Sequence, residues 1–272
     1  MTVIRTRAVT SLVVGLLVVL GSACGPAPVA DQGYVMVFRE EFDGQHLHPV
    51  WQTDPLGTPL PPEVGNGVLT LRSRTANANT WGIVGSTGPR AADGSGYPDA
   101  ESWHYGYFEA RIRYTDNRWV WAGFWMLSMA KTNAWPGEDC RHLNAEWDIM
   151  ENGAQGIEGA HPAASWSFTA LHRNTSDSTA DGYCGIPDVQ RTHGTEHADK
   201  DLSDWHVWSG HWTADEVCTY LDGVELSCMP PYDSTHQPMH LVLSIDYLHR
   251  CTGCPPKPAE LVMQVDWVRV WQ

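Results

Sequence analysis

The sequence predicts an all-β protein, folded as a sandwich or a barrel. From Val35 onward the chain consists of short runs in which polar and apolar residues alternate, separated by Gly, Pro, Asn and Asp. Alternation with a period of two is typical of half-buried strands, and frequent turn residues are typical of sandwiches and barrels. No apolar stripe with helical spacing interrupts this pattern. We therefore expect strands throughout residues 35–272.

The individual strands follow from the same alternation. A Gly-Asn-Gly turn at residues 65–67 precedes the first of them. Glycines and prolines gather at residues 85–104 and predict a long surface loop, and residues 173–204 are polar and loop-like. Strands are expected at residues 68–72, 107–113, 121–127, 145–151, 206–213, 240–247 and 261–271, with a hairpin around Cys218 and Cys228.

One of these strands has a conspicuously polar face. In residues 107–113 the side chains of Tyr107, Glu109, Arg111 and Arg113 fall on one side. We predict that this face is a cleft floor, and that Arg111 contacts the ligand.

The N-terminal residues indicate export. Residues 1–23 combine arginines, an apolar run and small residues, as a secretory signal does. The apolar run is shorter than the roughly 20 residues that span a membrane. Cys24 resembles the lipidated cysteine of a bacterial lipoprotein, so a cell-surface lipoprotein is expected, with a plain secreted protein as the alternative. A tether at residues 24–34 would lead to a single catalytic domain at residues 35–272.

Six further cysteines form an even number, which in an exported chain predicts disulfides. A hairpin with a three-residue loop centred on Gly223 would place Cys218 opposite Cys228. The other predicted pairs are Cys251 with Cys254, as a small loop staple, and by elimination Cys140 with Cys184.

Composition narrows the partners. A net charge of −15 argues against nucleic acid and disfavours heavily sulfated polysaccharides. The 14 tryptophans exceed what a core needs and suggest faces on which sugar rings stack. We expect a monomer that binds polysaccharide and touches a membrane only through its lipid.

Three carboxylates lie close together in residues 145–151. Glu146 and Asp148 share one face of an extended chain, whereas strict alternation sends Glu151 to the other. A β-bulge at Ile149–Met150 would turn Glu151 to the same face, and such bulges are frequent beside active sites. Glycoside hydrolysis needs two carboxyl groups, and the retaining mechanism needs them about 5–5.5 Å apart. The alternative is an acidic strand in solvent.

Six segments, in the same order, resemble glycoside hydrolase family 16. Residues 105–112 are similar to the family's Tyr-Gly-Arg-Phe-Glu-Ala-Arg stretch, and residues 146–151 to its bulged Glu-Ile-Asp-Ile-Met-Glu signature. The other segments are residues 38–44, 121–127, 220–223 and 265–271. The resemblance implies a β-jelly-roll sandwich of two antiparallel sheets with a concave substrate cleft.

The resemblance also implies roles for the acids. Glu146 would be the nucleophile, Glu151 the acid/base, and Asp148 the residue that tunes the nucleophile. Crowded carboxylates independently favour this division, because one of them takes a raised pKa and holds a proton near neutral pH.

Further residues are carried over from the family. Trp121 and Trp135 would line the cleft, as would Trp125, although Trp121 and Trp125 fit a core equally well. His172 looks like the family's histidine near the catalytic strand. No cofactor is expected for catalysis, but the family commonly holds a structural calcium, here at Glu41, Gly67 and Asp266.

The expected activity is a retaining endo-glycoside hydrolase on a β-linked polysaccharide, with β-1,3-glucan favoured. A β-galactan or agar-type endohydrolase, a transglycosylase, and a non-catalytic carbohydrate-binding protein are the alternatives. The substrate is open because residues 137–144 and 243–250 depart from the family pattern.

A zinc protease is the rival from another class. His193, Glu196 and His197 spell His-x-x-Glu-His, which binds zinc when a helix brings both histidines to one face. Gly194 and the lack of an apolar stripe make a helix poor there.

Overall fold

The structure is a computed structural model that describes residues 33–53, 60–75, 82–86, 101–128, 145–152, 165–173, 189–248 and 254–272. Its regular elements in these ranges are strands, apart from one 3-10 turn at Asp233–His236. None of the described segments forms a helix that is long and apolar enough to cross a membrane. The predicted signal, the lipidation site Cys24 and residues 24–32 of the predicted tether lie outside the described residues.

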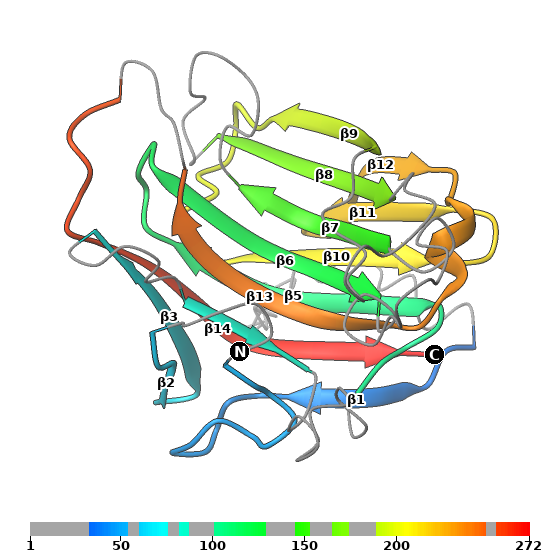
Figure 1. Ribbon diagram of the computed structural model, residues 1–272, viewed down its shortest axis with the longest axis horizontal. Helices are drawn as coiled ribbons and strands as arrows, with labels where there is room; N and C mark the ends of the chain where they lie inside the picture. The colour runs from blue at the N-terminus through cyan, green and yellow to red at the C-terminus, as the bar shows by residue number, and fades with distance from the viewer. Residues whose placement is uncertain are drawn as a thin grey trace, which may run out of the picture.

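The strands form two antiparallel sheets (Figure 1). In the eight-stranded sheet the order is β12-β11-β10-β5-β14-β3-β2, and β1 pairs with β14. Its strands are β1 (Met36–Glu40), β2 (Glu63–Gly65), β3 (Val68–Arg74), β5 (Gly106–Tyr114), β10 (His206–Trp212), β11 (Val217–Leu221), β12 (Val224–Met229) and β14 (Glu260–Trp271).

The six-stranded sheet has the order β4-β13-β6-β7-β8-β9. Figure 1 shows β6, β7 and β8 side by side in this sheet. Its strands are β4 (Gly82–Gly85), β6 (Val120–Ser128), β7 (Ala145–Asn152), β8 (Trp166–Arg173), β9 (Val189–Glu196) and β13 (Met239–Tyr247).

Alternate residues of both sheets fill the core. Phe108 and Ile112 of β5, Phe124 of β6 and Trp147 of β7 are all fully buried and belong to one hydrophobic cluster. Burial of alternate residues explains why the period-two pattern was visible in the sequence. The predicted β-jelly-roll sandwich is confirmed.

The predicted loop at residues 173–204 is wrong in part, because Val189–Glu196 forms strand β9 and pairs with β8. This strand lies at the edge of its sheet, and residues 191–194 are exposed. An edge strand needs little apolar character, so its sequence resembles a loop.

The predicted cleft floor on β5 is also wrong. Phe108 and Ile112 face the core, so Arg111 points outward from the eight-stranded sheet, away from the other sheet. There Arg111 Nη1 donates to Asp266 Oδ2 at 2.5 Å, and its guanidinium lies over the ring of Trp205. Alternation identified the polar face correctly but could not tell which side of the sandwich it occupies.

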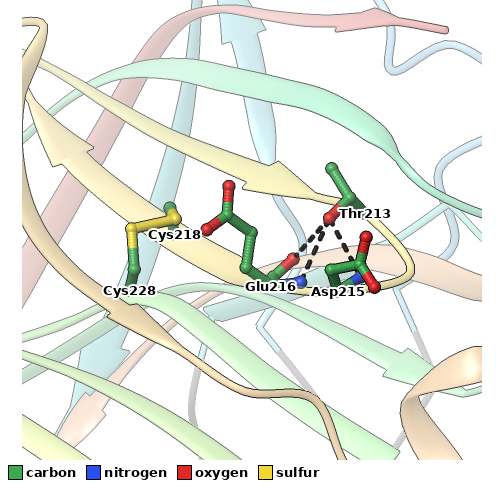
Figure 2. Close-up of a disulfide and its surroundings, with 5 residues drawn as sticks. All are labelled: Thr213, Asp215, Glu216, Cys218 and Cys228. Atoms are coloured by element: carbon green, nitrogen blue, oxygen red, sulfur yellow. Dashed lines mark hydrogen bonds between the residues drawn. A yellow bond between two sulfur atoms is a disulfide. The ribbon is translucent and has the colours of Figure 1, made fainter.

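The predicted Cys218–Cys228 disulfide is present (Figure 2). The connection is shorter than predicted, because Leu221 pairs directly with Val224 across a two-residue turn. Asp222 and Gly223 both have positive φ there. A register shift after Thr219 restores Cys218 opposite Cys228.

The remaining disulfide predictions stay predictions. Cys254 is disulfide-bonded, to a partner outside the described residues. The other cysteines of the predicted pairs also lie outside them: Cys140, Cys184 and Cys251.

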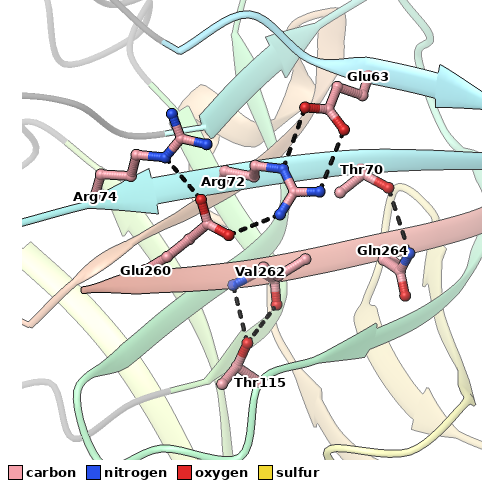
Figure 3. A network of polar contacts seen from close by, with 8 residues as sticks. All are labelled: Glu63, Thr70, Arg72, Arg74, Thr115, Glu260, Val262 and Gln264. Carbon is pink, nitrogen blue, oxygen red and sulfur yellow. Dashed lines mark hydrogen bonds and ion pairs between the residues drawn. The ribbon is translucent and has the colours of Figure 1, made fainter. Parts of the chain in front are cut away.

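Ion pairs tie three strands together at one end of the eight-stranded sheet (Figure 3). Arg72 of β3 donates to Glu63 of β2 and to Glu260 of β14, and Arg74 donates to the same Glu260. Exposed pairs of this kind contribute little individually, but they fix the register of the sheet edge.

Strand β7 is held against the opposite sheet at both ends. Near its start, Trp147 packs over Gly210 of β10, where a Cβ atom would come within 2.6 Å of Trp147 Cζ2. At its end, the buried Asn152 side chain donates to the hydroxyl of Tyr114 on β5. These two contacts with the eight-stranded sheet therefore fix the β7 backbone between them.

Substitution Gly210→Ala should destabilise the protein by about 1–3 kcal/mol, because the new methyl group overlaps the indole of Trp147. Urea unfolding measures this change. Gly65→Ala is the matched control, since a Cβ atom there meets nothing within 4 Å. Equal stability of the two variants would contradict the close contact under β7.

Candidate active site

A β-bulge in β7 creates the site. Trp125 and Phe124 are consecutive on β6, yet they pair with Asp148 and Met150, so Ile149 is an extra residue. The register with β8 shifts in the same interval. Ile149 and Met150 are both buried in the core. The predicted bulge is confirmed.

As a result, the three acids share the face opposite the core. Glu146 pairs with His172, and Glu151 pairs with Phe168; paired residues project to the same side of a sheet. One ligand atom each of Glu146, Asp148 and His172 lie within 4.8 Å of one another. Asp148 and Glu146 also interact electrostatically with Glu151, so the structure brings together the three acids that the sequence predicts as catalytic.

Glu151 is adjusted to hold a proton. Trp121 Nε1 donates to Glu151 Oε1 at 2.6 Å. Burial of the carboxyl group, followed by the negative charge of Asp148, raises the pKa of Glu151 to about 8, although the bond from Trp121 opposes this. Glu151 is therefore protonated at neutral pH.

His172 supplies the compensating charge. Its Nε2 lies 2.8 Å from Asp148 Oδ2. Burial disfavours the imidazolium, but the hydrogen bond and charge of Asp148, with Glu146 and Glu151 nearby, raise the pKa of His172 to about 9. A protonated His172 occupies the place beside the carboxylates that a metal ion would otherwise take, so the cluster fits an ion pair better than a metal site.

Strands β6 and β13 complete this face. Trp125 is half-buried, and its Nε1 donates to Ser244 Oγ at 3.0 Å. Between Trp121 and Trp125 stands Gly123, the cross-strand partner of Glu151. A Cβ atom at Gly123 would lie 3.0 Å from both Ser244 Oγ and Trp125 Cδ1. The glycine therefore leaves room for the indole of Trp125.

The other predicted ligand-binding residues divide three ways. Trp121, Trp125 and His172 lie on the face of the acids. Trp135 lies outside the described residues. Arg111 is in the opposite sheet and does not approach the acids.

The carboxylates of the predicted calcium ligands are engaged in ion pairs. Arg269 donates to both carboxylate oxygens of Glu41, at 2.9 and 3.1 Å. Asp266 is paired with Arg111. Gly67, with φ +72° in its turn, has only its backbone carbonyl to offer, an oxygen of a kind that calcium binds. A structural calcium at these residues stays a prediction.

The zinc-protease pattern is not realised. His193 and Glu196 lie in a strand instead of a helix, so their side chains point to opposite faces. His197 is buried and hydrogen-bonded through Nε2 to Ser167 Oγ at 2.8 Å.

Sequence reasoning missed the aromatic residues of β8. Trp166 and Phe168 share the face of the acids, because Phe168 pairs with Glu151 and Trp166 is two residues away. Counting back in twos from His172 would have found them. Ser244 was missed because its segment departs from the family pattern.

Comparison with known proteins found a similar sequence and solved structures of the same fold. No known family model matches the chain. The chain is similar to a beta-glucanase of Rhodothermus marinus, with 26% identity over 300 residues that cover 98% of this chain and 94% of the relative.

Two solved structures share the fold. One is the laminarinase catalytic domain from Thermotoga maritima, with a TM-score of 0.62 and 20% identity, covering 88% of this chain and 98% of that one. The other is a GlcNAcα1-4Gal-releasing endo-β-galactosidase from Clostridium perfringens, with a TM-score of 0.65 and 19% identity. It covers 91% of this chain and 65% of that one. The fold is that of the jelly-roll glycoside hydrolases, as the resemblance to family 16 implies.

The raised pKa of Glu151 predicts a pH-dependent stability. Between the ordinary pKa of 4.5 and about 8, the folded protein holds a proton that the unfolded chain releases. Stability therefore falls as pH rises through this window. Glu151→Gln removes this dependence. The melting temperature of the variant minus that of the wild type should therefore increase by several degrees from pH 5 to pH 8.

Glu225→Gln is the control, since Glu225 is exposed on β12 of the opposite sheet. Thermal melting at both pH values measures the difference. A gap between Glu151→Gln and wild type that is the same at pH 5 and pH 8 would contradict a buried, protonated Glu151.

Proposed function

We propose that this protein is a retaining glycoside hydrolase that cleaves a β-linked polysaccharide within its chain. The observation that carries the proposal is the bulge in β7, which puts Glu146, Asp148 and Glu151 on one face while Glu151 keeps a proton. Hydrolysis of a glycosidic bond requires one carboxylate and one carboxylic acid, and this site offers both.

In the first step, a carboxylate oxygen of Glu146 attacks the anomeric carbon. The bond from that carbon to the glycosidic oxygen breaks, and Glu151 gives its proton to the leaving oxygen. In the second step, Glu151 takes a proton from water, the water oxygen attacks the same carbon, and the ester to Glu146 breaks.

Charge balance explains why Glu151 is the acid. Imidazolium at His172 partly neutralises Asp148, which pairs with it at 2.8 Å. A third negative charge at Glu151 would be desolvated and repelled, so the proton stays there. His172 and Asp148, which lie within 4.8 Å of Glu146, act as positioning residues for it.

We favour β-1,3-glucan as the substrate. The beta-glucanase relative, which matches nearly the whole length of both chains, supports a β-glucan; the 1,3 linkage follows from the resemblance of the bulged motif. A β-galactan is the second candidate, supported by the fold likeness to an endo-β-galactosidase. A carbohydrate-binding protein without turnover is less well supported, because binding alone does not need a protonated carboxyl group beside two further acids.

We also propose that the protein is exported. The Cys218–Cys228 disulfide supports this, because such bonds persist in oxidising compartments. Anchoring through Cys24 is part of the same proposal.

Reducing-sugar release from laminarin, lichenan, agarose and galactan tests the activity. We expect cleavage of laminarin by the wild type and none by Glu146→Gln, which cannot form the ester. Glu225→Gln should match the wild type. Equal release by wild type and Glu146→Gln would remove the catalytic assignment, and chain elongation with an added acceptor sugar would indicate a transglycosylase.

The acid role of Glu151 predicts the alkaline limb of the pH profile. Because the proton must be present, kcat/KM should fall about tenfold per pH unit above a pKa of about 8. Glu151→Gln should lower the rate by about 10²–10⁴-fold and abolish that limb. Persistence of the same limb in Glu151→Gln would assign the proton to another group.

A further inference from the structure

Strand β8 carries two stacked aromatic rings beside the acids. We call Trp166 and Phe168 the aromatic shelf. Their ring centroids lie 6.3 Å apart, with 26° between the planes. Phe168 is the cross-strand partner of Glu151, so the shelf continues the surface of the acids across the six-stranded sheet.

Phe168 supports the indole of its neighbour Trp166. It is only 4% exposed, yet it belongs to neither hydrophobic cluster of the described core. Its ring packs closely against Gly194 of β9, because a Cβ atom there would come within 2.8 Å of Phe168 Cε1. A glycine inside a strand often marks such a close approach. The side chain thus packs onto the outer face of the sheet instead of into the sandwich.

Trp166 stacks on the ring of Phe168 and is half-buried. Its cross-strand partner on β9 is Glu196, which is exposed on the same face. A flat indole with an acceptor carboxylate beside it offers both parts of a sugar site, namely an apolar surface for the C–H face of the ring and an acceptor for its hydroxyl groups.

We propose that the aromatic shelf is a binding subsite for one neutral sugar unit of the polysaccharide, outside the two units that flank the scissile bond. The inference rests on the proposed function, which supplies the polysaccharide. Continuity with Glu151 selects this ligand, because a chain bound over the acids and directed toward β9 must pass over β8. The carboxylate of Glu196 selects a neutral sugar over a sulfated or uronic one, since like charges repel.

Trp166 lies two residues along β8 from Phe168, the position opposite Glu151, or about 6–7 Å at the usual rise of a strand. Together with the spacing of about 5 Å between neighbouring strands, this displacement separates the indole from the sugar that receives the proton. The subsite therefore contributes to binding a long chain and not to the chemical step.

Trp166→Ala is the test, with Trp166→Leu as a second variant that keeps apolar bulk but loses the flat ring. KM for laminarin should rise about tenfold with kcat within about twofold of the wild type. Cleavage of the shortest laminarin oligosaccharide that the wild type cleaves should change less than about twofold, because that substrate does not reach the shelf.

Trp267→Ala is the matched control, since this half-buried tryptophan stacks with Arg269 on the outer face of the opposite sheet. Retardation in gels that contain laminarin or galactan measures binding without turnover, in a Glu151→Gln background. We expect weaker retardation of both Trp166 variants by the polymer that the wild type cleaves, and none of this change in Trp267→Ala.

The outcomes separate the two proposals. A wild type that cleaves laminarin, with Trp166→Ala and Trp166→Leu unchanged in KM and retardation, overturns the shelf and leaves the proposed function intact. If the wild type cleaves nothing, while Glu151→Gln is retarded and loses this retardation with both Trp166 substitutions, the hydrolase is overturned and the shelf is kept. If neither laminarin nor galactan retards Glu151→Gln, the shelf is overturned.

Discussion

One extra residue in β7 is the constraint on which the site depends. Without it, Glu151 would project into the core with Trp147, where a carboxyl group has no partner and a large desolvation cost. With it, Ile149 and Met150 both face the core, and the strand returns to alternation with Glu151 on the outer face. The bulge thus satisfies packing on one side and collects acids on the other. Packing of Trp147 on Gly210 and the Asn152–Tyr114 contact hold it between fixed ends.

Holding Glu151 on that face has an electrostatic cost, and the neighbouring residues limit it. Burial and Asp148 raise the pKa of Glu151, so the group avoids its charge by keeping a proton. His172, with its own pKa raised to about 9, balances Asp148. Both shifts favour the protonated form, which leaves Glu151 neutral and His172 charged within one cluster. The same arrangement makes the folded state less stable above neutral pH than a glutamine at residue 151 would.

Features that depend on adjacent residues could be predicted from the sequence, whereas features that depend on pairing between distant strands could not. Period-two burial located most strands, and the break in alternation at Ile149–Met150 predicted the bulge, because both are properties of adjacent residues. The edge strand β9 was missed because exposure removes the apolar signal. Arg111 was assigned to the wrong side because alternation defines two faces without saying which one meets the other sheet. The two-residue turn at Asp222–Gly223 was misjudged because the compensating bulge depends on pairing with β12.

The partners of the carboxylates distinguish the polar face of the eight-stranded sheet from that of the six-stranded sheet, which the alternation of residues does not. On the outside of the eight-stranded sheet several carboxylates form ion pairs with guanidinium groups, as in Glu41 with Arg269, Asp266 with Arg111 and Glu260 with Arg72. On the six-stranded sheet Glu151 instead accepts a hydrogen bond from the indole N–H of Trp121, and Asp148 is hydrogen-bonded to the imidazole of His172. Burial and the charge of Asp148 keep a proton on Glu151 in spite of these partners, and the stacked rings of Trp166 and Phe168 lie on the same face. This face combines a protonated carboxyl group with flat aromatic surface. Such a face suits a neutral polar ligand whose rings have apolar faces, as the rings of a sugar chain do.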